Sequence, residues 1–182
     1  AGLEGPVALV GVGLMGGSLG LALRRIAGTG DVRGIDPGHG VIARAAELGA
    51  VTSAPGSLAD AVRGASVVVV GAPVGDIPQV VREVLAVADP DTVVTDIGSA
   101  KGDVLAALTP EERARFCGGH PVAGGERAGV ENARGDLFEG ATWFLTPTAE
   151  TRPDLLQRVH ALVSAVGARP VAVDPDVHDH LM

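Results

Sequence analysis

The chain has 182 residues, 46% of them hydrophobic and 20% charged, a balance typical of one globular domain. Its 14 basic and 22 acidic residues give a formal net charge of −8 without any basic block, which argues against nucleic acid and against an anionic membrane as partners. No apolar run approaches the ~20 residues of a membrane span, and the single cysteine, Cys117, excludes an internal disulfide, so we expect a cytoplasmic protein.

Short valine-rich runs alternate along the chain with segments in which apolar residues have helical spacing. The runs predict strands over 6–12, 32–36, 66–72, 92–97, 141–146 and 170–174, and the segments predict helices over 14–27, 38–48, 76–88 and 152–166. Ser57 and Thr109, each followed three positions later by an acid, predict two further helix starts. The alternation predicts an α/β fold, a Rossmann-type doubly wound and mostly parallel sheet covered on both faces.

The glycine-rich stretch GVGLMG follows the first predicted strand and opens the first predicted helix. In that context G-x-G-x-x-G indicates dinucleotide binding. Gly11 permits a tight turn, Gly13 lets the backbone approach a pyrophosphate, and Gly16 allows close packing of helix on strand. Leu14 and Met15 begin the helix, whose free N–H groups would face the phosphates. The alternative is a glycine-rich turn in an α/β domain that binds no nucleotide.

The carboxylate of Asp36 ends the second predicted strand, where a dinucleotide-binding fold places the acid that binds the ribose 2′-hydroxyl. No arginine occurs at 37–39 to receive a 2′-phosphate. We therefore expect NAD as the cofactor, with NADP the less favoured alternative.

The stretch GAPV follows the third clear strand, and its Ala72, Pro73 and Val74 would lie at the carboxyl edge of the sheet. Loops at that edge of a parallel sheet line the ligand crevice. We expect these three residues to contact the cofactor, although an ordinary turn at the end of a strand would look the same.

The stretch DIGSAKG follows the next strand and places Gly98, Ser99 and Lys101 at the same edge. Ser99 is a candidate for contact with cofactor and substrate, and capping of the helix that follows is its alternative role. Lys101 is the only lysine in the chain. We expect it to pair with an acid such as Asp96 or Asp103 rather than to bind an anion.

The stretch CGGHPVAGGE places His120 between a glycine pair and a proline. It follows a short run, Phe116-Cys117, that could be one more strand end at the same edge, and we interpret the stretch as a glycine loop. A neutral imidazole beside a nicotinamide can take the proton of a hydroxyl while hydride leaves the same carbon, and an ordinary pKa of ~6.5 suits this task. We expect His120 to be the catalytic base; a purely structural histidine is the alternative.

Taken in order, GVGLMGGSLGLAL, IDP, GAPV, DIGSAKG, GGHPVAGGE, LFEGATWFLTP and VHDHLM resemble the prephenate dehydrogenase family, which includes arogenate and cyclohexadienyl dehydrogenases. The resemblance implies NAD(P)-dependent oxidative decarboxylation of prephenate to 4-hydroxyphenylpyruvate, or of arogenate to tyrosine. It implies that His120 takes the proton of the ring hydroxyl and that Ser99 lies between cofactor, substrate and His120. Gly125 and Glu126 would bind substrate, with Glu126 at the mouth of the site, and no metal is implied.

Three residues depart from the family's usual pattern: Gly119 replaces a common serine, Val122 a common methionine and Ala72 a common hydroxyl-bearing residue. The first two line the histidine loop and put the choice of substrate in doubt more than the chemistry, whereas Ala72 would weaken one contact to the cofactor.

A cap signal at Asp174-Pro175-Asp176 predicts a helix that starts shortly before the last residue, Met182. We expect residues 1–173 to be the dinucleotide-binding domain and 174–182 to begin a C-terminal helical domain; a frayed tail is the alternative. The resemblance implies that this second domain forms a homodimer and supplies basic residues for the substrate carboxylates. The chain alone would then bind NAD and turn over poorly or not at all.

Two other functions remain open for this sequence. One is a β-hydroxyacid or 6-phosphogluconate-like dehydrogenase, which shares the first glycine motif. The other is a non-catalytic, NAD-binding regulatory module, which would have no turnover to lose if His120 were replaced.

Overall fold

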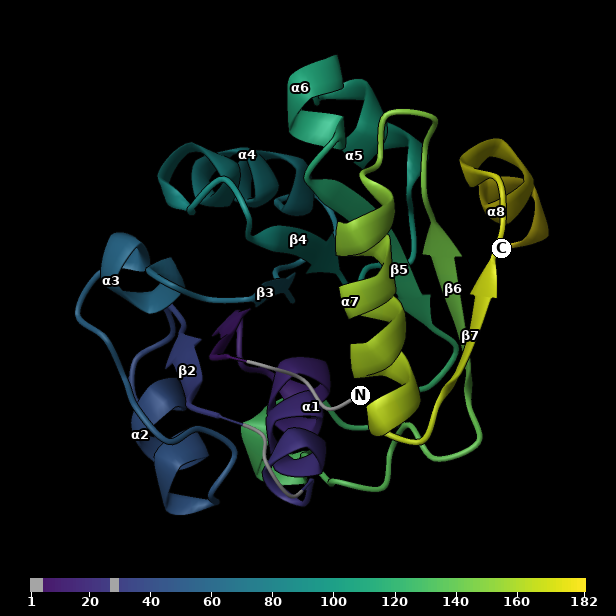
Figure 1. The fold of residues 1–182 in the computed structure, drawn as a ribbon. Coiled ribbons are helices and arrows are strands. Elements are labelled where there is room, and N and C mark those ends of the chain that lie inside the picture. Colours follow the sequence, from purple (N-terminus) through teal and green to yellow (C-terminus); the bar gives the residue numbers. More distant parts are fainter. Residues whose placement is uncertain (1–4, 27–29) are drawn as a thin grey trace.

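The valine-rich runs pair into one seven-stranded sheet in the computed structural model, which describes residues 5–26 and 30–182 (Figure 1). The strands are β1 (Val7–Val10), β2 (Val32–Ile35), β3 (Val67–Val70), β4 (Val93–Asp96), β5 (Phe116–Pro121), β6 (Thr142–Thr146) and β7 (Arg169–Ala172). Their order is β2-β1-β3-β4-β5-β6-β7, and each neighbouring pair is parallel except β5 with β6. The predicted doubly wound, mostly parallel α/β fold is confirmed.

The helices are α1 (Leu14–Arg24), α2 (Val41–Glu47), α3 (Leu58–Val62), α4 (Ile77–Val87), α5 (Gly102–Ala106), α6 (Pro110–Arg113), α7 (Pro153–Ala165) and α8 (Pro175–Leu181), with a 3₁₀ turn at Val130–Asn132. Three helices, α3, α6 and α8, begin at the cap signals Ser57, Thr109 and Asp174. Ser57 accepts a hydrogen bond from the N–H of Asp60, and Thr109 forms a capping box with Glu112. The expected end of the first helix, at Ala27, lies outside the described residues.

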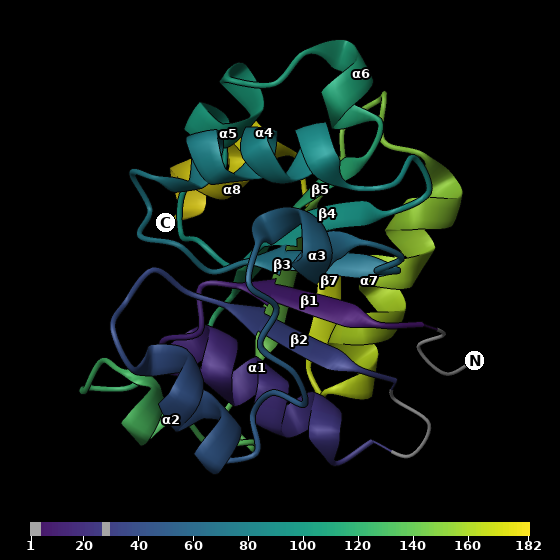
Figure 2. The same cartoon turned by 90° about the vertical axis from the view of Figure 1, so that its left-hand side faces the viewer.

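Two apolar cores lie on the two faces of the sheet because successive strand residues point in opposite directions. Val67 and Val69 of β3 belong to one core, while Val68 and Val70 belong to the other. Helices α1 and α7 pack on the first face and α3 and α4 on the second (Figure 2). Each fully buried valine or leucine stabilises the fold by roughly 1.5–3 kcal/mol, so this double layer fixes the strand ends that carry the loops.

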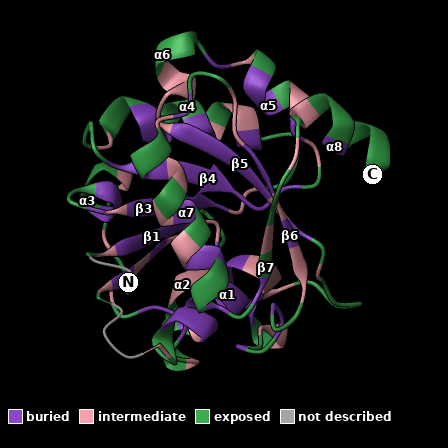
Figure 3. Cartoon of the chain, turned by 45° about the vertical axis from the view of Figure 1, so that its right-hand side comes forward, coloured by how far each residue is buried: buried purple, intermediate pink, exposed green. Residues whose placement is uncertain are grey.

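Burial falls off toward the last two elements of the chain. Figure 3 shows β3, β4 and β5 buried and β7 mostly exposed. In α8, His178 is the only buried residue. Within the described part of the chain, no helix is long and apolar enough to cross a membrane.

The histidine segment forms part of a strand, so the predicted glycine loop is wrong at this point. β5 continues through His120 to Pro121 because it pairs on both sides: its start is parallel to β4, and its end is antiparallel to β6, with His120 opposite Phe144. Gly118 and Gly119 lie opposite Thr146 and Leu145 of β6 in this pairing. His120 is held by a strand rather than by a mobile loop, and the glycine-rich segment begins only after Pro121.

A buried ion pair joins β4, the loop after it and β5. The ammonium of Lys101 and the carboxylate of Asp96 are fully buried and contact each other, and Lys101 Nζ also donates a hydrogen bond of 2.7 Å to the carbonyl oxygen of Gly119. The Asp96 carboxylate accepts the N–H groups of Gly98 at 3.0 Å and Gly119 at 3.1 Å. The expectation that Lys101 pairs with an acid is confirmed, and the pair holds the residue next to His120 in place.

Replacing Lys101 by methionine should lower the free energy of unfolding by about 3–5 kcal/mol, because it leaves the Asp96 carboxylate buried without its counter-ion. Chemical denaturation measures the loss. The matched control is Arg63→Met, which removes an exposed ion pair with Asp60 and should cost less than about 1 kcal/mol. A similar small loss in both variants would contradict the structural role of the buried pair.

Candidate active site

A cleft opens at the carboxyl edge of the sheet, beside the point where the chain order reverses between β1 and β3. This reversal is where doubly wound folds bind their ligands. The cleft has a volume of about 380 Å³. Its lining comes from the start of α1, the loops after β3 and β4, and the end of β5 with the segment that follows: Leu14, Met15, Gly71, Ala72, Pro73, Val74, Ile97, Gly98, Ser99, His120, Pro121, Ala123, Gly124 and Gly125.

Two of the three motif glycines are required by the packing of the protein itself. Gly11 has a φ of +94°, and a Cβ there would lie 2.6 Å from the backbone of Gly71. A Cβ on Gly16 would overlap the carbonyl oxygen of Gly11. A Cβ on Gly13, in contrast, would meet no protein atom within 4 Å, so the space beside it is free for a ligand.

The start of α1 faces the cleft without a side-chain cap. Gly13 is the residue before the helix, no side chain there accepts a hydrogen bond from the first turn, and the first turn holds no acidic residue. The free N–H groups and the positive end of the helix dipole therefore make this position suitable for an anion such as a pyrophosphate.

Asp36 holds the glycine loop in a way that the sequence pattern did not indicate. One carboxylate oxygen accepts the N–H of Val12 at 2.8 Å, and the other accepts the N–H of Gly38 at 2.7 Å. Each carboxylate oxygen has a second lone pair, so Asp36 can fix the loop and still accept a hydrogen bond from a ribose hydroxyl.

The structure brings most of the predicted site residues into one cleft. Leu14, Met15, Ala72, Pro73, Val74, Gly98, Ser99, His120 and Gly125 line it. Gly11, Gly13, Gly16 and Asp36 belong to the adjoining glycine loop and strand end. Glu126 is exposed and does not line the cleft. Ser99 is exposed at the cleft and does not cap α5, whose N-cap is Lys101.

Gly119 has no room for a side chain. A Cβ there would lie 2.5 Å from the carbonyl oxygen of Asp96 and 2.9 Å from Trp143 Nε1. Trp143 Nε1 and Thr95 Oγ1 are buried without a hydrogen-bond partner among the described residues. Close packing of β5 against β4 and β6 therefore explains why glycine, rather than the family's common serine, occupies position 119 in this chain.

His120 is half-buried at the end of β5, and its environment keeps the imidazole neutral. Burial, which is the largest effect, and the nearby positive charge of Lys101 lower the pKa of His120 below its ordinary value of 6.5. A neutral imidazole at pH 7 has one ring nitrogen free to accept a proton. The position and the charge state both suit a general base.

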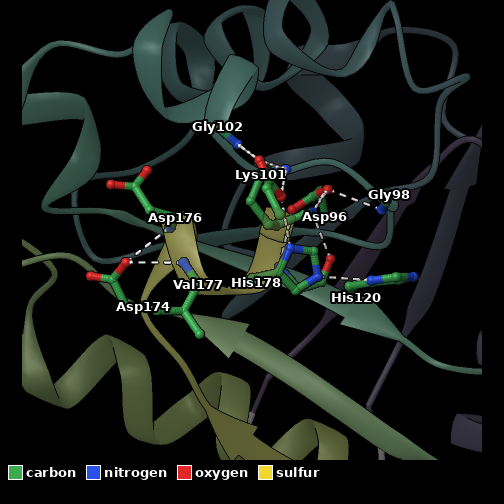
Figure 4. A network of polar contacts seen from close by, with 11 residues as sticks. Asp96, Gly98, Lys101, Gly102, His120, Asp174, Asp176, Val177 and His178 are labelled. Atoms are coloured by element: carbon green, nitrogen blue, oxygen red, sulfur yellow. Dashed lines mark hydrogen bonds and ion pairs between the residues drawn. The ribbon is translucent and has the colours of Figure 1, made fainter. Parts of the chain in front are cut away.

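Two residues of α8 complete the polar network and were missed from the sequence. His178 Nε2 lies 2.9 Å from His120 Nδ1, and His178 Nδ1 lies 2.8 Å from Asp179 Oδ1. Asp179 in turn accepts the N–H groups of Lys101 and Gly102. Figure 4 shows His178 between the His120 ring and the start of α5. VHDHLM contributed only to the family resemblance, although its adjacent His-Asp pair was a signal that could have been followed.

Comparison with known proteins agrees with this geometry. The family described as "Prephenate dehydrogenase, nucleotide-binding domain" matches residues 19–172. Prephenate dehydrogenase from Bacillus subtilis (strain 168) is 30% identical over 180 residues, which are 97% of this chain and 48% of the relative. The chain thus spans about half the length of that relative.

Solved structures match over almost the whole chain. Prephenate dehydrogenase from Aquifex aeolicus in complex with hydroxyphenyl propionate and NAD⁺ is 34% identical with a TM-score of 0.89, over 97% of this chain and 62% of that one. Synechocystis arogenate dehydrogenase is 28% identical with the same TM-score of 0.89, over 97% of this chain and 62% of that one. The chain therefore belongs to the prephenate dehydrogenase family and corresponds to the nucleotide-binding domain of that family.

Proposed function

We propose that the chain binds NAD in the cleft, and that the protein to which it belongs oxidatively decarboxylates prephenate to 4-hydroxyphenylpyruvate. The observation that carries the proposal is the placement of His120. His120, with its neutral imidazole, lines the cleft. The start of α1, which has no side-chain cap, and the open space beside Gly13 adjoin the same cleft. The Aquifex aeolicus structure with hydroxyphenyl propionate and NAD⁺ supports the choice of both ligands.

The residues around the glycine loop fit NAD. The backbone at Gly13 and the first turn of α1 would hold the pyrophosphate, and Asp36 would accept a ribose hydroxyl. The apolar side chains that line the cleft, Leu14, Met15, Ala72, Pro73 and Val74, would exclude water from the reacting atoms. When bound, NAD supplies the acceptor for the hydride.

His120 would take the proton of the substrate's ring hydroxyl as hydride leaves the same carbon and a carbonyl forms. The ring carboxylate then leaves as carbon dioxide, and the electron pair of the broken C–C bond restores aromaticity. The ring oxygen finally takes up a proton to give the phenol. Ser99, exposed in the same cleft, would hydrogen-bond the hydroxyl and orient it toward His120, and Gly125 and Glu126 would approach the substrate from the mouth of the site.

Arogenate is the second candidate substrate. The Synechocystis arogenate dehydrogenase fits the chain with the same TM-score as the prephenate enzyme, and the two substrates share the ring alcohol on which His120 would act. A likeness to 3-hydroxyisobutyrate dehydrogenase from Mycobacterium tuberculosis, at 23% identity and a TM-score of 0.69, shows the fold alone. Of the two dehydrogenations, we favour that of prephenate because the curated relative at 30% identity is a prephenate dehydrogenase.

The proposal extends to the whole protein. We expect a cytoplasmic enzyme of tyrosine biosynthesis that forms a homodimer and binds the substrate carboxylates through a region C-terminal to this chain, with 1–173 as the cofactor domain and 174–182 as the start of the next. The exposed apolar residues at the end of α8, Leu181 and Met182, would pack against that region. The chain alone would therefore bind NAD with little or no turnover.

Calorimetric titration should show that NAD binds at least ~10-fold more tightly than NADP, because a hydrogen bond to a charged carboxylate contributes about 1.5–3 kcal/mol and the 2′-phosphate would face that charge. Asp36→Asn should reduce this ratio. The ratio is the measurement, since Asp36 also anchors the glycine loop and its loss weakens both cofactors. Glu47→Gln, at the far end of α2, is the control and should leave the ratio unchanged. Equal binding of NAD and NADP by the wild type would contradict the role of Asp36 as acceptor for the ribose hydroxyl.

Replacing His120 by asparagine in the intact protein should lower kcat by 10²–10⁴-fold, the usual contribution of a general base, while the affinity for NAD stays within about two-fold. His160→Asn is the matched control, since His160 is exposed on α7 and should leave kcat unchanged. Steady-state rates with prephenate and then with arogenate measure both variants and rank the substrates. Full turnover in His120→Asn would mean that another group is the base.

The pH profile follows from the lowered pKa of His120. A base whose pKa is lowered stays neutral to a lower pH, so the acid limb of kcat/KM in the intact enzyme should be centred below pH 6.5, the ordinary value for histidine. Folding stability should fall in the same direction, because the unfolded histidine takes up a proton first. An acid limb centred above pH 6.5 would contradict the environment described for this ring.

A further inference from the structure

We propose that His178 and Asp179 form a positioning dyad that fixes the tautomer and the orientation of His120, so that His120 Nε2 is the basic atom. The inference rests on the proposed role of His120 as the base. It adds two residues of α8 to the machinery of the reaction, and it states which nitrogen of the His120 ring does the chemistry.

The direction of each hydrogen bond follows from Asp179. Its Oδ1 accepts the N–H of Lys101 at 3.0 Å and faces His178 Nδ1 at 2.8 Å, and its Oδ2 accepts the N–H of Gly102 at 2.7 Å. Burial by itself would raise the pKa of Asp179, but the hydrogen bonds from His178, Gly102 and Lys101 lower it overall. An ionised carboxylate is an acceptor only. His178 Nδ1 must therefore carry the proton that lies between the two residues.

The same reasoning passes from His178 to His120. We take His178 in its uncharged form, in which the single ring proton, held on Nδ1 by Asp179, leaves a lone pair on Nε2. His178 Nε2 lies 2.9 Å from His120 Nδ1, so His120 Nδ1 must donate. The remaining nitrogen of His120, Nε2, is left with a lone pair and no proton, as a base requires. The opposite tautomer would put a proton on the nitrogen that has to accept one.

Packing keeps the hydrogen-bonded chain of Asp179, His178 and His120 in one arrangement. The His178 side chain is fully buried and meets the rings of His120 and Phe144 edge-to-face, with centroids 5.1 and 5.7 Å apart. The start of α8 is fixed by Asp174, whose carboxylate caps the N–H groups of Asp176 and Val177 (Figure 4). His178 therefore keeps one orientation, and the hydrogen bond to His120 keeps the second ring in one orientation too.

The first test is the tautomeric state of the wild-type chain, read by two-dimensional NMR after selective ¹⁵N labelling of histidine. His120 and His178 should both show a protonated Nδ1 and an unprotonated Nε2 at pH 7.5, with exposed His160 and His180 as internal references. This test requires no variant. A protonated Nε2 on His120 would overturn the proposal.

The second test is Asp179→Asn. The amide oxygen would face the N–H groups of Lys101 and Gly102, and the amide nitrogen would donate to His178 Nδ1, so both rings should move their proton to Nε2. In the intact protein kcat should fall by 10²–10⁴-fold, with KM and NAD affinity within about two-fold. Asp176→Asn, on the same helix with an exposed carboxylate, is the matched control. Thermal unfolding of both variants checks that the fold is intact.

The outcomes separate this inference from the proposed function. A change of tautomer together with the loss of kcat supports the dyad. An unchanged tautomer in Asp179→Asn, or a changed tautomer with full kcat, overturns it. If His120→Asn keeps its turnover, the proposed function fails by a different measurement, because the NMR spectra of the wild type do not depend on which residue is the base.

Discussion

The buried contact between Lys101 and Asp96 is the constraint on which the site depends. It ties the end of β4 to β5, because Lys101 also donates to the carbonyl of Gly119 while Asp96 accepts the N–H of Gly119. His120 is the next residue along β5. Two charges removed from water are costly unless they are paired and hydrogen-bonded, so separating Lys101 from Asp96 would be unfavourable. Because Gly119 is held by both members of the pair, the backbone position of His120 is held as well.

The residues around Lys101 act on His120 from two directions. The Lys101 side chain holds the strand of His120 through Gly119, while the backbone N–H groups of Lys101 and Gly102 hold Asp179 and, through it, His178. The DIGSAKG segment therefore contacts both β5 and α8 and links the two elements. Its hydroxyl, on Ser99, is free at the cleft because capping of α5 does not use it. The segment thus combines a structural anchor with a candidate contact to the substrate.

Most of the fold was predictable because the signals are local. Capping residues such as Ser57 and Thr109 bond to groups three positions away, and buried strands read as apolar runs whatever their order in the sheet. β5 was predicted only in part: the short run Phe116-Cys117 suggested a strand end, but GGHP has few apolar side chains and reads as a loop. It is a strand because β6, some 25 residues later, pairs with it, and no local pattern reports a partner at that distance.

The sequence by itself determined the class of fold, the glycine loop and the edge of the sheet at which His120, Ser99 and the residues predicted to bind the cofactor meet, since parallel strands bring their carboxyl ends together. Only the tertiary structure showed that Asp36 anchors the glycine loop, that Glu126 lies outside the cleft, and that His178 and Asp179 reach His120. The reason is physical: a hydrogen bond between residues 58 positions apart depends on where two elements pack. Periodicity and spacing in the sequence report the local structure of each element and not which distant elements it packs against.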